Sequence, residues 1–278
     1  SSILLASPHV EHSESDPGVE RIKQAPERHQ LSPAVEGVGD GRPFFTEPYR
    51  DFSIESERTA FASAIAASEV PTVERISTKE EITAIVDVAH DAFGTWRDVD
   101  PLIRSQVLVK AAELMRKRRD ELCGVVMREA GKTWREADGD VCETIDFCEY
   151  YARMAPQLFE YERLGEFIGE LDQQFYQPRG VTAVISPWNF PMAICCGMTV
   201  AALVTGNTVL VKPAGQTTGI AKLICEMLWE AGAPKDVLHF VAGPGSIIGS
   251  ALVRDPRVAV IAFTGSKGVG LDILEAAG

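Results

Sequence analysis

Basic side chains are scarce in this sequence of 278 residues, which has 27 lysines and arginines against 40 aspartates and glutamates. The net charge of −13 repels phosphate backbones, so we expect no nucleic acid as a partner. Cysteine and histidine are also few. The six cysteines contain no C-x-x-C pair, and the five histidines have no metal-ligand spacing. We therefore predict no metal site and no disulfide framework, in a reduced, cytoplasmic location.

Long apolar segments are missing too. The longest run without a charged residue, 180–211, contains Pro187, Pro191 and the pair Gly206-Asn207. These residues divide it into pieces shorter than the roughly 20 residues of a membrane-spanning helix, so we predict no membrane span. The hydrophobic fraction of 45% and the charged fraction of 24% are instead typical of a globular protein.

The first 180 residues show three kinds of pattern. Residues 1–45 are rich in Glu, Ser, Pro and Gly without periodicity, which is typical of an extension or linker. Residues 165–178 alternate loosely, like a protruding two-stranded ribbon. A capping box of Ser77 and Glu80 is expected to open the first clear helix. Apolar periodicity predicts helices at about 78–93, 101–120, 121–129 and 133–154.

From residue 180 onward, strands and helices alternate strictly. Strands are predicted at 181–185, 208–211, 237–241 and 258–263, and helices at 191–203, 217–229, 246–253 and from 267. The strands are continuous runs of Val, Ile and Leu, as expected when both faces of a sheet are buried. The pattern predicts an α/β domain over residues 46–278, with N-terminal helices and a doubly wound, Rossmann-type parallel sheet.

Unusual residues follow the predicted strands, at the edge where open α/β sheets bind ligands. Asn189 lies between two prolines after the first strand, and Lys212 ends the second. The amide could stabilise an oxyanion or bond its own turn, and the lysine could reach a nucleotide or remain solvated. Glycine clusters at 243–249 and 265–270 follow the next two strands, as in a pyrophosphate site or an ordinary tight turn.

Two other motifs have simpler interpretations. Gly131-Lys132-Thr133 imitates the end of a phosphate-binding P-loop, but Val126 stands where that motif requires its first glycine. We interpret these three residues as a turn that joins two helices. Cys195 and Cys196 lie in an apolar helix start without a nearby His or Asp, so we interpret them as core residues and not as nucleophiles.

Three motifs together resemble the aldehyde dehydrogenase superfamily. They are Ser-Pro-Trp-Asn-Phe-Pro at 186–191, Val-Lys-Pro-Ala at 211–214 and Phe-Thr-Gly-Ser at 263–266, in the order and spacing of that family. Further stretches between residues 129 and 147 are most similar to the glutamate-γ-semialdehyde (1-pyrroline-5-carboxylate) dehydrogenases. The segment 47–53 is similar to bifunctional proline-utilisation proteins, which implies a proline dehydrogenase domain fused or adjacent to this chain.

The resemblance implies NAD as the cofactor and a small-molecule aldehyde, glutamate-γ-semialdehyde, as the substrate that is oxidised to glutamate. Asn189 would stabilise the oxyanion, and Glu143 and Phe190 would face the amino-acid end of the substrate. The 165–178 hairpin would mediate homo-oligomerisation. The implied cofactor-binding residues are Ser186, Trp188, Lys212, Gly215, Gly245, Phe263, Gly265, Ser266 and Val269.

The sequence departs from the family pattern at two points. Gly215 stands where the family usually has a ribose-binding glutamate, which leaves the choice between NAD and NADP open. The Gly-Gln-x-Cys segment of the catalytic thiol does not occur, so we expect an N-terminal part of a longer enzyme, inactive alone. The alternatives are a nucleotide-binding or scaffold module without catalysis, and a dehydrogenase of another aldehyde.

Overall fold

A parallel sheet of four strands forms the centre of the computed structural model, which describes residues 36–39, 41–166 and 168–277. The strand order β5-β4-β3-β6 is that of the first four strands, 3-2-1-4, of a Rossmann-type sheet, so the predicted fold class is confirmed. The extension predicted at 1–45 lies largely outside the described residues. The strands are β3 (Val181–Ile185), β4 (Thr208–Lys212), β5 (Leu238–Phe240) and β6 (Val258–Phe263), each within one residue of its prediction.

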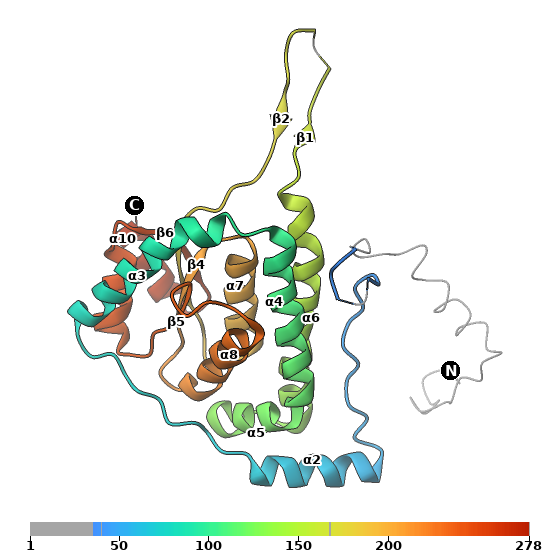
Figure 1. The fold of residues 1–278 in the computed structure, drawn as a ribbon. Helices are drawn as coiled ribbons and strands as arrows, with labels where there is room; N and C mark the ends of the chain where they lie inside the picture. The colour runs from blue at the N-terminus through green and yellow to red at the C-terminus, as the bar shows by residue number, and fades with distance from the viewer. Residues whose placement is uncertain (1–35, 40, 167, 278) are drawn as a thin grey trace, which may run out of the picture.

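Helices cover both faces of this sheet (Figure 1). One face packs on α7 (Ala193–Val204) and α8 (Thr218–Ala231), and α4 (Pro101–Lys117) and α6 (Trp134–Leu158) pack against those two helices. The other face packs on α3 (Lys79–Arg97) and α9 (Ser250–Arg254). Neighbouring strand residues alternate between the two cores: Val209 and Val211 lie in the first, and Leu210 lies in the second. This alternation explains why the strands are apolar throughout.

The capping box of α3 is displaced by one residue from its predicted place. Thr78 Oγ1 accepts a hydrogen bond from Glu81 N at 3.2 Å, and a Glu81 carboxylate oxygen accepts one from Thr78 N at 2.9 Å. The prediction of Ser77 and Glu80 is therefore wrong. Both pairs fit the same four-residue pattern, so the sequence alone could not distinguish them.

A joint of three residues connects α5 (Arg119–Ala130) to α6. Gly131 ends α5 with a φ of +67°, a left-handed conformation that glycine adopts without strain. Thr133 then opens α6 through a capping box with Glu136. The interpretation of 131–133 as a turn is confirmed, and Lys132 is held between two helix caps.

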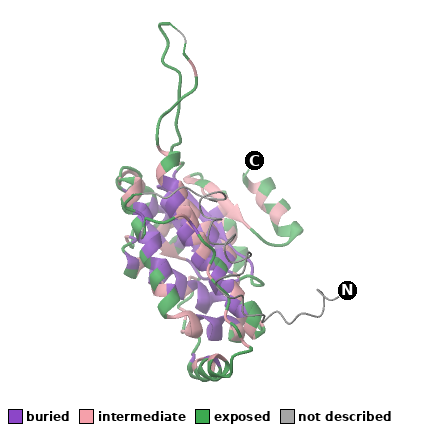
Figure 2. Cartoon of the chain, turned by 90° about the vertical axis from the view of Figure 1, so that its right-hand side faces the viewer, coloured by how far each residue is buried: buried purple, intermediate pink, exposed green. Residues whose placement is uncertain are grey.

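A hairpin protrudes from the end of α6 (Figure 1). Its strands are β1 (Glu162–Arg163) and β2 (Gln173–Gln174), which pair antiparallel. The ribbon was predicted at 165–178, but its first strand lies before that range and closer to the domain, where the rings of Tyr161 and Phe175 meet at 5.0 Å. Part of the predicted range instead forms the turn, with Gly169 at a φ of +88°. Figure 2 shows that the hairpin is exposed along its length.

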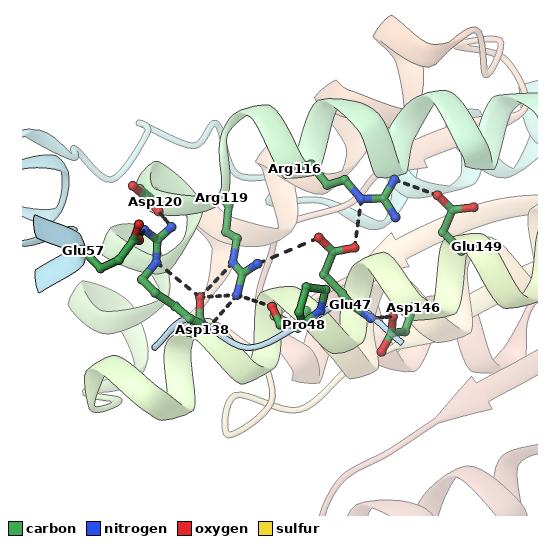
Figure 3. Close-up of polar contacts among 11 residues, drawn as sticks. Glu47, Pro48, Glu57, Arg116, Arg119, Asp120, Asp138, Asp146 and Glu149 are labelled. Atoms are coloured by element: carbon green, nitrogen blue, oxygen red, sulfur yellow. Dashed lines mark hydrogen bonds and ion pairs between the residues drawn. The ribbon is translucent and has the colours of Figure 1, made fainter. Parts of the chain in front are cut away.

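Ion pairs attach the segment before α2 (Glu55–Ala67) to helices α4, α5 and α6 (Figure 3). Asp138 is 1% exposed and accepts two bonds from the Arg119 guanidinium, at 2.7 and 2.8 Å, and one from Arg50 N at 2.8 Å. The carboxylate of Glu47 accepts from Arg116 at 2.9 Å. We call these five residues the anchor network.

The last described helix, α10 (Lys267–Ala277), contrasts with the other helices of the sheet because it contains no buried residue. Figure 2 shows it at the margin of the domain, coloured as intermediate and exposed. Among the residues that the structure describes, no helix combines the length and apolar character needed to cross a membrane.

Candidate cofactor groove and substrate loop

Three chain segments leave the sheet together at its carboxyl edge. In the strand register Ile185 pairs with both Lys212 and Phe263. The bonds continue just beyond the strands, because Ser186 N donates to Lys212 O at 3.2 Å and Thr264 N donates to Ile185 O at 3.1 Å. The loop with Asn189, the lysine and the second glycine cluster therefore start from one edge, as the sequence predicted.

A groove of about 760 Å³ lies at this edge. Three of the nine predicted cofactor residues line it: Lys212, Gly245 and Val269. Gly215 lies on an exposed turn outside the lining, with no atom within 4 Å of the position that a Cβ would take. Ser246 and Gly249, from the predicted glycine cluster at 243–249, also line it, and the lining residues that we did not predict include Arg254, Asp272, Ile273 and Glu275.

Lys212 is the most unusual group in the groove. Its side chain is buried, with 7% of the residue exposed, and its Nζ donates to Pro213 O at 3.3 Å. Within the described ranges it has no ion pair, and burial lowers the pKa of its ammonium group. Burying an unpaired cation is costly unless a polar partner compensates. The Lys212 ammonium group can therefore bind a ligand that brings hydrogen-bond acceptors into this part of the groove.

The first glycine cluster differs from the expected helix at 246–253. It forms a π-helical turn over Gly245–Gly249, in which Ser250 N reaches back to Gly245 O, and a short α9 follows. A Cβ at Gly249 would lie 3.4 Å from Lys212 Cε, whereas one at Gly245 would meet nothing within 4 Å. π-helical turns concentrate at functional sites. Here the turn leaves the backbone at Gly245 uncovered on the side of the groove.

The second glycine cluster packs around Phe263. A Cβ at Gly265 would lie 2.7 Å from the Phe263 ring, so any side chain there would force that ring to move. Ser266 Oγ accepts a hydrogen bond from Val269 N at 3.4 Å, which caps the start of α10. Phe263, Gly265 and Ser266 lie outside the groove lining, so among the residues of this cluster the groove contacts Val269.

The loop between β3 and α7 presents three exposed side chains, Trp188, Asn189 and Phe190, whereas Ser186 is buried. The Asn189 carboxamide makes no hydrogen bond with any residue that the structure describes. A turn asparagine that bonds its own backbone, the alternative interpretation, is therefore not found. A free amide at the carboxyl edge of the sheet can donate to a ligand.

Charged residues of α6 and of its joint surround the end of this loop. Lys132 Nζ lies 3.3 Å from Asp140 Oδ2 and 4.0 Å from the centre of the Phe190 ring. Burial raises the pKa of Asp140, against the effect of the Lys132 cation. Burial and the Asp140 charge likewise raise the pKa of the exposed Glu143, while Lys132 lowers it. The structure thus places the predicted substrate residue Phe190 against one cationic side chain, whose charge also acts on the second, Glu143.

We did not predict a role for Lys132 or Asp140 from the sequence. The available signals were the acidic pair Asp140 and Glu143, three residues apart on one helix face, and a lysine that we considered only as part of a P-loop. What the sequence cannot show is that α6 places this face beside the 186–192 loop.

None of the cysteines has the setting of a nucleophile. All six are free and buried. Burial raises the pKa of Cys142 to about 12 and that of Cys195 to about 11. A thiol in that state is protonated near neutral pH and reacts poorly. Among the described residues, no cluster of three or more His, Cys, Asp or Glu side chains could hold a metal ion.

Comparison with known proteins agrees with this geometry. The sequence profile described as the aldehyde dehydrogenase family matches residues 54–278. The chain belongs to the aldehyde dehydrogenase family. A 1-pyrroline-5-carboxylate dehydrogenase of Halalkalibacterium halodurans is 40% identical over 271 residues, which cover 85% of this chain and 52% of the relative. The chain thus spans about half the length of the curated relatives that it matches.

Solved structures of other aldehyde dehydrogenases have the same fold. A Thermus 1-pyrroline-5-carboxylate dehydrogenase with bound NAD is 38% identical, with a TM-score of 0.79 over 85% of this chain and 52% of that chain. Proline utilization A from Bdellovibrio bacteriovorus is 36% identical, with a TM-score of 0.79 over 88% of this chain and 28% of that chain. The predicted family resemblance and its 1-pyrroline-5-carboxylate dehydrogenase branch are confirmed.

Proposed function

We propose that this chain is the cofactor-binding part of an NAD-dependent enzyme that oxidises glutamate-γ-semialdehyde, formed from 1-pyrroline-5-carboxylate, to glutamate. The observation that carries the proposal is the buried Lys212 ammonium, which has no ion pair among the described residues and lines a groove of about 760 Å³. A dinucleotide supplies the missing acceptors through its ribose hydroxyls and phosphates. The 1-pyrroline-5-carboxylate dehydrogenases among the relatives, one of them with bound NAD, support the same cofactor and substrate.

The chain's own residues hold the cofactor at the carboxyl edge of the sheet. Lys212 donates to the ribose, the open backbone at Gly245 approaches the pyrophosphate, and Val269 packs on the adenine. Ser186, Trp188, Gly215, Phe263, Gly265 and Ser266 shape the loops around it. Bound NAD accepts the hydride of the aldehyde.

Asn189 serves the chemistry at the aldehyde carbon. Its free amide donates to the oxyanion that forms when a cysteine thiolate attacks the carbonyl carbon. That thiolate is not one of the six buried cysteines, so the 278 residues alone are expected to be inactive. Glu143 and Phe190 bind the amino-acid end of the substrate: the carboxylate pairs with an ammonium group, and the ring covers the aliphatic stem.

The oligomeric state, a second domain and the cellular compartment are the remaining parts of the proposal. The hairpin exposes apolar side chains such as Tyr161, Leu171 and Tyr176, which we propose to be covered in a homo-oligomer. The proline utilization A neighbours support a proline dehydrogenase domain fused or adjacent to this chain. Six free cysteines support a reduced, cytoplasmic compartment.

The proposal is tested with Asn189→Ala in the full-length enzyme. We expect the acylation rate constant, measured as the pre-steady-state burst of reduced cofactor, to fall roughly 10²–10³-fold, as for the loss of one oxyanion donor. The affinity for NAD, measured by calorimetry, should stay within about twofold, because Asn189 does not line the groove. Gln106→Ala, an exposed position on α4, serves as the control. An unchanged burst in Asn189→Ala would remove the oxyanion role.

A further inference from the structure

We infer that Lys132 is a positioning residue, which holds the 186–192 loop so that Asn189 faces the reacting carbonyl group. The inference rests on the proposed function, since it assigns to Lys132 the task of orienting the oxyanion donor. The joint 131–133 precedes that loop by more than 50 residues in the sequence. Its lysine nevertheless contacts Phe190 directly and the start of α7 through Asp140.

The first contact is an ion pair that reaches the start of α7. Lys132 Nζ lies 3.3 Å from Asp140 Oδ2, and Asp140 Oδ1 accepts a hydrogen bond from Ala193 N at 2.9 Å. Asp140 is 3% exposed, and the Lys132 side chain is 10% exposed. A carboxylate in so dry a place needs both partners to remain ionised. The lysine therefore favours the ionised carboxylate, which accepts the hydrogen bond from Ala193 N more strongly than a neutral acid would.

The second contact is with the loop itself. The Lys132 ammonium lies 4.0 Å from the centre of the Phe190 ring, within the range of a cation–π interaction. Phe190 follows Asn189 directly and is 46% exposed, so the packing of the domain alone does not fix its ring. Phe190 and Ala193 hold the chain after Asn189, and the bond from Ser186 N to Lys212 O holds the chain before it. Asn189 therefore has little freedom to turn away from the sheet edge.

The joint is built to keep this lysine in one place. Gly131 and Thr133 each end or open a helix, so the backbone at Lys132 is fixed by two caps. The lysine could have a structural role only, in which case its loss would weaken the fold and lower all functions together. A positioning role predicts a more selective defect.

The test is a double-mutant cycle in the full-length enzyme with Lys132→Met and Asn189→Ala. We expect Lys132→Met alone to lower the acylation rate constant about 10- to 100-fold, the cost of misplacing a reacting group. In the Asn189→Ala background the same change should cost less than about threefold, because no oxyanion donor remains to be positioned. Lys132→Arg, which keeps the charge and the face-on contact, should recover most of the rate. The NAD affinity of all variants should stay within about twofold.

The outcomes distinguish the oxyanion role of Asn189 from the positioning role of Lys132. If Asn189→Ala alone leaves the burst unchanged, the proposed oxyanion role fails and the positioning role fails with it. If Asn189→Ala is costly but the two changes are additive, only the positioning role is overturned. Equal losses of NAD affinity and of acylation rate in Lys132→Met would likewise show a general structural defect. Should Lys132→Met not fold, Asp140→Asn replaces it in the cycle, since it removes the ion pair with Lys132 and keeps an oxygen that can accept from Ala193 N.

Discussion

The anchor network and the cofactor groove use buried charge in opposite ways. In the anchor network, the carboxylate of Asp138 has cationic partners on Arg119 and Arg50, and Glu47 is paired with Arg116. In the groove, Lys212 is also buried but contacts one carbonyl oxygen and has no ion pair among the described residues. The difference indicates that charges paired with opposite charges serve the fold, whereas a buried charge without such a partner marks where a ligand binds.

The largest effect is expected when the anchor network is broken. Asp138→Ala removes the common partner of two arginines and leaves Arg119, whose side chain is 13% exposed, with a more distant carboxylate of Glu47 at 3.9 Å. Loss of one partner from a buried ion pair typically costs about 3–5 kcal/mol. We expect the free energy of unfolding in urea to fall by about that amount. Glu57→Ala, which removes a 44% exposed partner of Arg50, should cost less than about 1 kcal/mol.

Removal of a buried charge from the groove should have a different effect on stability from removal of one from the anchor network. Lys212→Met removes a buried charge whose pKa is lowered by desolvation, so the folded state binds the proton less well than the unfolded state. Below the folded pKa this penalty is fully present, and it disappears as the pH rises above the unfolded value. The variant should therefore be at least as stable as the parent at neutral pH.

The affinity for NAD, unlike the stability, should fall in Lys212→Met. Loss of a charged hydrogen-bond donor costs about 1.5–3 kcal/mol, so calorimetry should show NAD affinity in Lys212→Met reduced roughly 10- to 100-fold. Lys110→Met, at an exposed position of α4, should change neither property. A variant that loses stability and keeps its affinity would assign Lys212 to the fold.

The smallest effect concerns the choice between cofactors. Gly215 offers no side chain to the ribose or to a 2′-phosphate, and nothing lies within 4 Å of its Cβ position, so a longer residue fits there. Gly215→Glu in the full-length enzyme should widen the NAD-over-NADP ratio of kcat/KM. The reasons are repulsion of the 2′-phosphate and one new hydrogen bond worth about 1 kcal/mol. A ratio that stays constant or narrows would mean that this turn does not meet the ribose.

The sheet and its carboxyl edge could be predicted because one physical pattern determines both. Strands buried on two faces must be apolar throughout, and polar residues such as Asn189 and Lys212 then stand out where the strands end. Helix starts were harder to predict when neighbouring residues offered equivalent caps, as Ser77 and Thr78 do. The hairpin pairing could not be located, since exposed strands have no buried face to fix their register.

The residues missed in the site were those whose role depends on tertiary packing. Lys132 belongs to a local turn by sequence, and only the packing of α6 on α7 brings it and its neighbour Asp140 to the loop that carries Phe190. The groove lining from α10, such as Asp272, was missed for the same reason. Several residues implied by the family resemblance, among them Gly215 and Ser266, lie outside the lining, and their roles remain predictions.

The start of α6 has a consequence for how this region can vary in length. One residue inserted into the first turns of α6, before Asp138, would turn everything beyond it by about 100° around the helix axis. Asp138 would then leave the anchor arginines while Asp140 left Lys132, although the two aspartates serve different regions of the molecule. The start of α6 thus fixes both spacings at once, and we expect tolerated insertions to accumulate in the exposed hairpin and to be absent from residues 134–138.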